Sequence, residues 1–446
     1  MGKSKMPALF LLMCLLYSSV FSLELLSLQE SIRKAIDNNP SLSAISAQVL
    51  QSEAGIGIAR SQYFPKLNFT QTFQRTNNPP QSFFFKLNQR DLNMMTMDFN
   101  NPGISTDFES KLQIVQPVYS GGLIHAGYKM SKKEFEVNKI KWRKALEDVS
   151  YQTSRNWYQL IIAKQAENVA RKAYKDAQEH VRITQANYDD GRGMKSDMLR
   201  AKVLLSQMEQ NYIQSETQVE LARQIFNTIL GSKEIKWDAE GKLAFSSFSA
   251  DREQLINYAL TNRSEVLEMH LLQDQAHLKK VMVQSDFMPS ISLIGQIQLN
   301  SSDLPFKNDA NSWFGALVFS FPVFDGFARN YKLSQSNAGI TAINESLNDM
   351  VNKIQLDVNR AYLELRSAEN RIKLTQNSEE QAEESLRLTE LRYQNGLATI
   401  TDVMDMQTSL NQTRLLALQA LADYNLSIIG LNYSTGKMLS YYDIQF

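Results

Sequence analysis

The sequence has a single cysteine, Cys14, among its 446 residues, and no stretch after the first 22 residues approaches the roughly 18 consecutive apolar residues of a membrane-crossing helix. One thiol cannot form a disulfide framework within the chain. The missing apolar runs argue against a helical membrane protein. Basic and acidic residues both number 47, so the chain has no excess positive charge with which to bind nucleic acid.

The first 22 residues have the features of a secretory signal peptide. Lys3 and Lys5 precede an apolar core from Phe10 to Tyr17, and small residues lead to a cleavage point near Ser22. An uncleaved anchor is the alternative, but the apolar core is short for a spanning helix. Cys14 lies inside this core, so we expect the mature chain to contain no cysteine and no thiolate metal site.

Motifs of catalysis are also missing. The sequence contains no phosphate-binding loop, nucleophile elbow or metalloprotease motif. Its histidines are His125, His180, His270 and His277. His270 and His277 could share one face of a helix, but no carboxylate pattern completes a metal site around them. The sequence therefore predicts no enzyme, no cofactor and no metal.

Two long polar stretches, 120–187 and 327–395, contain no proline and few glycines. At 1.5 Å per residue, about 68 residues form a helix roughly 100 Å long. Apolar residues such as Ile354, Val358 and Leu365 follow a heptad spacing, and the other faces are polar. So thin a seam favours a hollow wall with water on both sides, although an ordinary helical bundle or rod is the alternative.

The chain contains an internal duplication at a constant offset of 205 residues. The matching pairs are Tyr188 and Tyr393, Gly191 and Gly396, Asp197 and Asp402, and Gly231 and Gly436. Gly191 and Gly396 stand where a helix C-cap needs a positive φ, so each long helix should turn there and return as a second helix. We therefore expect two helical hairpins with tips near 188–197 and 393–402. Duplicated units usually build symmetric assemblies.

Four short segments are predicted to be strands. They are 66–75, 108–116, 291–299 and 314–321, each with at least partial alternation of polar and apolar residues and prolines near the ends of each pair. Their length of about 9–10 residues suits a tilted strand that crosses a bilayer, although soluble β-hairpins are the alternative. Four strands cannot close a barrel with a lumen, whereas three chains would supply twelve.

These patterns predict a mainly α-helical chain with a small β part. The expected divisions are a signal peptide over 1–22, a first repeat over 23–231 with a β-hairpin at about 66–116, a linker over 232–250, a second repeat over 251–433 with a β-hairpin at about 290–321, and a C-terminal segment over 434–446. Residues 76–107 are expected to form a long loop within the first β-hairpin.

The whole arrangement resembles the TolC-like outer-membrane efflux protein family, also called outer membrane factors. The most specific stretch is 393–405, with its tyrosine, glycine turn and Asp-Val-x-Asp pattern; the opening helix 28–40 and the helix-to-strand junctions at Pro65 and Pro289 are similar too. The resemblance spans about 25–436. It implies a homotrimer in the outer membrane, with a twelve-stranded transmembrane β-barrel continued by a long periplasmic α-helical barrel. The segments 232–250 and 434–446 would form an equatorial belt.

The same resemblance implies a function. The chain would be the passive, porin-like exit duct of a tripartite efflux pump or a type I secretion system. Its partners would be a periplasmic adaptor, an inner-membrane transporter of RND or ABC type and outer-membrane lipid. A coiled-coil structural protein of the cell envelope without a pore is the alternative, but such a rod has no use for two bilayer-length β-hairpins.

The resemblance also suggests a periplasmic gate. Asp402 and Asp405 would line it, and threefold symmetry would make each a ring of carboxylates that attracts cations. A simpler interpretation is that both are solvated carboxylates that favour the positive end of the helix dipole. The family's latch would include Tyr393 and Asp197. Its arginine position holds Ala398 here, and Arg192 and Lys195 on the first tip are candidates to replace it.

Overall fold

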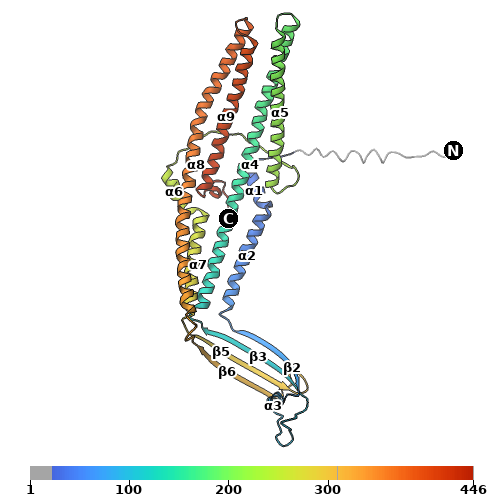
Figure 1. The fold of residues 1–446 in the computed structure, drawn as a ribbon, viewed down its shortest axis with the longest axis vertical. Coiled ribbons are helices and arrows are strands. Elements are labelled where there is room, and N and C mark those ends of the chain that lie inside the picture. Colours follow the sequence, from blue (N-terminus) through green and yellow to red (C-terminus); the bar gives the residue numbers. More distant parts are fainter. Residues whose placement is uncertain (1–22, 309, 445–446) are drawn as a thin grey trace, which may run out of the picture. The chain divides into compact units, whose positions relative to one another are not determined.

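A computed structural model of the chain describes residues 23–308 and 310–444 (Figure 1). The predicted signal peptide over 1–22, with Cys14, lies outside the described residues, as do the last two residues of the predicted C-terminal segment. In chain order the elements are β1 (Glu24–Leu26), α1 (Leu28–Asn38), α2 (Pro40–Ser61), β2 (Lys66–Thr76), α3 (Pro79–Asn88), β3 (Ser105–Tyr119), α4 (Leu123–Asp189), α5 (Lys195–Ile229), β4 (Trp237–Ala239), α6 (Arg252–Asn262), α7 (Ser264–Ser285), β5 (Ser290–Ser301), β6 (Ala310–Ser320), α8 (Ala328–Gln394), α9 (Ile400–Ser434) and α10 (Met438–Tyr441).

The duplication is visible in the lengths of the elements. The long helices α4 and α8 both have 67 residues, and the returning helices α5 and α9 both have 35. Each second copy starts 205 residues after the first. The shorter pairs, α1 with α6 and α2 with α7, also match in length, but their offset is 224 residues. The difference of 19 residues arises in the connection between β2 and β3, as the sequence indicates.

Two expectations about the β-segments are wrong. The stretch 76–107 is not all loop, because it contains α3, whose Asn78 cap accepts a hydrogen bond from the backbone of Gln81 and whose first turn begins with two prolines. Pro117 does not end its strand, since β3 continues to Tyr119. The pairing of β3 with β5 is irregular between Pro117 and Tyr119. An irregular position tolerates a proline because it needs no ladder donor there.

The four long strands form one antiparallel sheet in the order β2-β3-β5-β6. Its outer strands, β2 and β6, each pair on one side only within the chain. β1 and β4 form a separate parallel pair. No helix in the described part of the chain combines the length and the apolar character needed to cross a membrane.

The chain folds as two compact units. One comprises the residues up to Ser46, 141–267 and 350–446; the other comprises 47–140 and 268–349 and contains the four-stranded sheet. Both copies of the duplication contribute to each unit. The heptad seam predicted along α8 is confirmed in the first unit, where its members Ile354, Val358 and Leu365 are fully buried.

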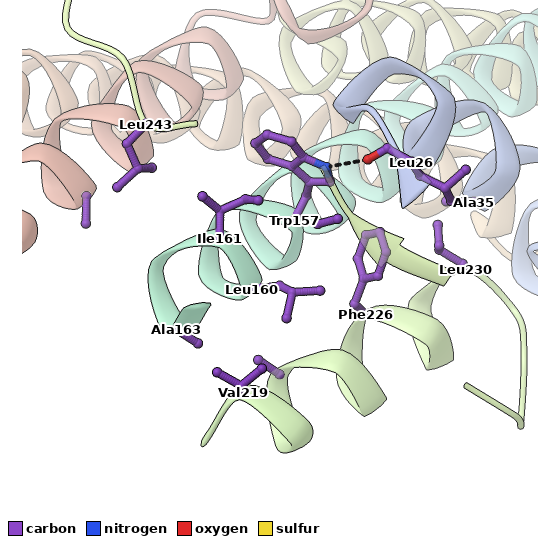
Figure 2. Packing of buried hydrophobic residues seen from close by; sticks show 13 residues of the cluster. Leu26, Ala35, Trp157, Leu160, Ile161, Ala163, Val219, Phe226, Leu230 and Leu243 are labelled. Atoms are coloured by element: carbon purple, nitrogen blue, oxygen red, sulfur yellow. Dashed lines mark hydrogen bonds between the residues drawn. The ribbon is translucent and has the colours of Figure 1, made fainter. Parts of the chain in front are cut away.

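The main apolar cluster packs around Trp157 of α4 (Figure 2). Leu160, Phe226 and Leu230 are buried beside it, and the indole nitrogen of Trp157 donates a hydrogen bond of 3.1 Å to the carbonyl oxygen of Leu26. The segment after β4 crosses the indole at Gly241. A Cβ at this position would lie 2.3 Å from the ring, so only glycine lets the backbone pass. The cluster therefore holds the predicted linker 232–250 against α4 and α5.

A buried cluster of charges lies where α6 meets α7. Glu265 forms ion pairs with Arg263 at 2.9 Å and with Lys144 of α4 at 3.2 Å, and Arg263 also reaches Asp357 of α8 at 3.3 Å. Burial alone would raise the pKa of Glu265. The hydrogen bond from Arg263 and the charge of Lys144 outweigh burial and lower the pKa to about 2. The cluster therefore joins three helices through carboxylates that stay ionised.

Candidate functional site

Both helical hairpins turn through the same glycine motif. Gly191 and Gly396 have φ of +73° and +72°. Each glycine N–H bonds to the tyrosine carbonyl three residues earlier at 2.9 Å, and the next residue's N–H bonds to a carbonyl five residues earlier at 2.8 Å. This Schellman arrangement satisfies the last carbonyls of α4 and α8. It fixes the two hairpin tips at the positions where the sequence places them.

Asp402 lies in the first turn of α9 and forms a capping box with Thr399. Its carboxylate accepts hydrogen bonds from the Thr399 backbone N–H at 2.7 Å and from the Thr399 hydroxyl at 2.8 Å. These two bonds hold the pKa of Asp402 below its ordinary value. The side chain is exposed to solvent and stays charged.

Asp405 follows one turn later, also exposed, and lines a groove of about 580 Å³ between α5 and α9. Arg200 of α5 lies in the same groove and donates a hydrogen bond of 3.2 Å to the hydroxyl of Thr401. The groove therefore brings a carboxylate and a guanidinium from the two hairpins onto one surface.

The two tips are joined by a hydrogen bond. The side-chain amide of Asn187, near the end of α4, donates to the hydroxyl of Tyr393 in α8 at 3.0 Å. The ring of Tyr393 packs against an apolar cluster shared by α5, α8 and α9, whose buried members are Ala201, Leu386, Ile400, Val403, Met404 and Leu410. One side chain therefore contacts both hairpins.

The other predicted latch residues lie on the first tip. Arg192 forms an ion pair with Asp190 of the same turn. Lys195 is exposed at the start of α5, and the carboxylate of Asp197 is half-buried and lies 3.4 Å from the hydroxyl of Ser196. Within this single chain, Tyr393 is paired with Asn187 and Arg192 with Asp190.

Sequence reasoning missed Asn187 and Arg200. The 205-residue offset contains a signal for Arg200, because it is the counterpart of Asp405. The duplicated position thus carries opposite charges in the two hairpins. Asn187 corresponds to Arg392, and nothing in that pair identifies Asn187 as the partner of Tyr393.

The four-stranded sheet has one apolar and one polar face. The registers of the three strand pairs place these residues on the apolar face: Leu67, Phe69, Phe73, Phe108, Leu112, Ile114, Leu293, Ile297, Leu299, Trp313, Leu317 and Phe319. Many of them are exposed; Trp313, for example, is 83% exposed. A surface this apolar needs a non-aqueous neighbour.

The opposite face is mostly polar. It carries Asn68, Thr70, Thr72, Gln74, Asp107, Glu109, Lys111, Gln113, Gln296, Gln298, Asn300 and Ser312, with Ile294, Phe314 and Val318 among its apolar members. A row of hydrogen bonds crosses it. Gln298 donates to Glu109 at 3.1 Å and to Asn300 at 2.8 Å, and Asn300 donates to Asp107 at 2.9 Å. Such a face suits contact with water.

The histidines do not gather into a site. His270 and His277 are exposed on α7, whereas His180 is buried in α4, where desolvation lowers its pKa. Within the described residues, no group of three or more histidine, cysteine or carboxylate side chains is placed to hold a metal ion.

Comparison with known families now decides the identity of the fold. The model of the family described as outer membrane efflux protein matches residues 31–232 and 255–437. The chain belongs to this family. It is therefore an outer-membrane protein of the TolC-like efflux class, as the motifs at 393–405 indicate, and the family is one of efflux ducts rather than of enzymes.

A curated relative has similar length. The chain is 22% identical over 431 residues to the outer membrane protein TolC of Vibrio cholerae serotype O1, which covers 92% of this chain and 91% of the relative. It is also 22% identical over 205 residues to TolC of Salmonella enteritidis, covering 43% of this chain and 42% of that protein.

Solved structures share the fold. The CmeC outer membrane channel of Campylobacter jejuni matches with a TM-score of 0.79 and 18% identity, covering 92% of this chain and 85% of that one. The open state of the MtrE outer membrane channel of Neisseria gonorrhoeae matches with a TM-score of 0.79 and 18% identity, covering 94% and 91%. At these identities the likeness establishes the fold alone.

Proposed function

We propose that the protein is a passive, trimeric exit duct in the outer membrane. The observation that carries this proposal is the sheet: four antiparallel strands with one apolar face, one polar face and two unpaired edges. Lipid accepts the apolar face and excludes free edges, so the sheet requires further strands to complete it.

Three copies supply those strands. The order β2-β3-β5-β6 alternates in direction, so β6 of one chain can pair with β2 of the next and keep every neighbour antiparallel. Repeating this heterologous contact around a threefold axis closes a ring of about twelve strands, an even number that leaves a lumen. The polar face then lines the lumen and the apolar face meets lipid.

The helices continue the duct on the periplasmic side. In this proposal, the first repeat (23–231) and the second repeat (251–433) each contribute one helical hairpin to an α-helical barrel. The linker 232–250 and the C-terminal segment 434–446 form the belt around it. The packing of the linker against Trp157 supports this placement.

The hairpin tips form the periplasmic gate. Asp402 and Asp405 supply carboxylates that threefold symmetry turns into rings, and the capping bonds from Thr399 keep Asp402 charged. A narrow ring of carboxylates attracts cations and repels anions. The latch candidates are Tyr393, Asp197, Arg192 and Lys195, acting at the turns of Gly191 and Gly396. The bond between Tyr393 and Asn187 supports a role for Tyr393 in holding the tips together.

The partners follow from the membership of an efflux family. A duct that crosses only the outer membrane needs a periplasmic adaptor and an energised inner-membrane transporter, of RND or ABC type. The complete assembly is a tripartite efflux pump or a type I secretion system. The groove between α5 and α9 offers a surface on the hairpins for such contacts.

Two neighbouring residues of β3 provide a test. Leu112 lies on the apolar face, between Phe69 and Ile297, whereas Gln113 lies on the polar face. Lysine near the middle of a lipid-facing strand costs about 2–4 kcal/mol. Leu112→Lys should therefore reduce heat-modifiable trimers in outer-membrane fractions, and Gln113→Lys should leave them unchanged.

Planar-bilayer recordings complete the test, because purified trimers should conduct ions. A native protein found as a monomer in the soluble periplasmic fraction would contradict the proposal. Equal trimer yields from the two lysine variants would contradict the assignment of the faces.

A further inference from the structure

The connection between β2 and β3, residues 77–104, is fastened to the end of the sheet. The side-chain amide of Gln89, just after α3, donates 2.8 Å hydrogen bonds to the carbonyl oxygen of Thr106 and to the carboxylate of Asp107. The guanidinium of Arg90 donates to the carbonyl oxygen of Asn311 at 2.7 Å. Figure 1 shows α3 and the rest of this connection at the end of the sheet where β2 ends and β3 begins.

The anchors place the connection against the polar face. Asp107 is 2% exposed, and its second carboxylate oxygen accepts a hydrogen bond of 2.9 Å from Asn300 of β5. Asp107 and Asn300 both belong to the polar face, and Asn311 begins the run of β6. The anchors therefore span β3, β5 and β6, so the connection lies across the sheet's end on the side that we assign to the lumen.

This connection exposes large apolar side chains. Phe84 is 57% exposed, Leu87 is 48% exposed and Met95 is 98% exposed. The segment is nevertheless folded, because Phe83 packs against Phe84 and Phe99 with ring centroids 5.7 and 5.9 Å apart. Apolar side chains displayed by a folded and anchored segment indicate a surface that is covered in the assembled protein.

We propose that the β2–β3 connections of three copies pack against one another and close the outer mouth of the duct. This inference rests on the proposed function, since it requires a closed barrel with the polar face inside. Threefold symmetry brings the three segments together around the axis, because each is fastened on the lumenal side. Phe84, Leu87 and Met95 then bury their apolar surface against the same segment of the neighbouring chains.

The second β-loop provides the matched control. Phe306 stacks on Phe69 with centroids 5.7 Å apart, and its backbone N–H bonds to the hydroxyl of Ser110 at 3.3 Å. Phe69 and Ser110 both lie on the lipid side of the sheet. Asp303, whose side chain is 66% exposed, is thus water-accessible at the same end of the sheet but directed away from the axis.

Single cysteines test the proposal, because Cys14 lies in the predicted signal peptide and the mature chain offers no competing thiol. With a short bis-maleimide added to cells, Met95→Cys should yield a covalent dimer on denaturing gels, and Asp303→Cys should yield none. In a Gln113→Cys background, Phe84→Asp with Met95→Asp should speed labelling by a bulky external maleimide by on the order of tenfold, since access limits the reaction.

The outcomes separate this inference from the proposed function. Loss of trimers and of conductance in the native protein would overturn both. Intact, conducting trimers without a Met95→Cys dimer, or with equal dimer from Asp303→Cys, would overturn only the mouth closure. Unchanged labelling of Gln113→Cys in the double aspartate variant would do the same, and would leave lipid as the cover of these side chains.

Discussion

The hydroxyl of Tyr393 accepts a hydrogen bond of 3.0 Å from the side-chain amide of Asn187, and this bond connects the two hairpin tips of one chain. The equivalent residue in the first hairpin, Tyr188, is 38% exposed. The duplicated tyrosines therefore have different surroundings, so one position can hold the tips together while its copy serves as a control.

Tyr393→Phe should loosen the tips. It removes the acceptor but keeps the ring that packs on the apolar cluster. A hydrogen bond contributes about 1 kcal/mol net, which corresponds to about a fivefold change in the ratio of open to closed tips. We expect more frequent open events in planar bilayers. Tyr188→Phe should record as the native protein does, and equal behaviour of the two variants would show that the bond does not hold the gate.

Asp402→Asn with Asp405→Asn should reduce the preference of the channel for cations, because both carboxylates are exposed near the gate and the capping bonds lower the pKa of Asp402. The native preference should accordingly persist in mildly acidic solution. Reversal potentials in a salt gradient measure the effect. Asp190→Asn is the control, since that carboxylate is paired with Arg192. An unchanged reversal potential in the double variant would remove both residues from the pore lining.

Glu265→Gln should destabilise the protein at neutral pH. The pKa of Glu265 is lowered to about 2 from an ordinary 4.5, so its contribution is present above the ordinary value and is lost as the pH falls toward 2. The shift corresponds to about 3 kcal/mol, and Arg263 also loses a buried partner. Thermal unfolding at several pH values should show a gap to the native protein that narrows below about pH 4.5. The exposed Glu253→Gln should show no gap, and a gap for Glu265→Gln that stays constant with pH would contradict the assignment.

Gly241→Ala should destabilise the linker, whereas Gly339→Ala should not. A methyl group at Gly241 would lie 2.3 Å from the indole of Trp157, while the Cβ position at Gly339 in α8 has open space around it. Alanine is more favourable than glycine inside a helix by about 0.5–1 kcal/mol, so Gly339→Ala should raise the unfolding temperature slightly. Limited proteolysis should cut the 232–250 linker faster only in Gly241→Ala. Equal protection in both variants would mean that the linker can move aside without cost.

The sequence predicts the long helices well because their ends have explicit signals. The prediction of 120–187 compares with α4 at Leu123–Asp189, and that of 327–395 compares with α8 at Ala328–Gln394. Glycines that adopt positive φ end both helices, and the heptad seam gives the buried side. These signals are local, so they survive without knowledge of the tertiary structure.

The segment around α3 shows where local signals were overlooked. Asn78 followed by two prolines is a recognisable helix start, but the surrounding asparagine, phenylalanine and methionine residues suggested a loop. Pro117 was taken as a strand end, yet an irregular register keeps it inside β3. In both places the structure uses proline within an element rather than at its boundary.

The contacts of the candidate site depend on tertiary packing. The bond between Asn187 and Tyr393 joins residues 206 positions apart, and the pairing of β3 with β5 joins strands from different repeats. Periodicity shows which side of an element is apolar, but not which other element lies against it. The two faces of the sheet therefore became clear only once the register of all four strands was known.

The matched lengths of the duplicated helices restrict how this protein can change. Removing one residue from α4 would rotate everything beyond it by about 100°, so the tip would no longer meet its copy in register. Substitutions leave the lengths intact, and the two copies have diverged freely, even to opposite charges at Arg200 and Asp405. Within the paired helices and strands, amino-acid identity is thus free to drift while residue count is fixed; the 19 extra residues lie in the β2–β3 connection, where no helical register has to be kept.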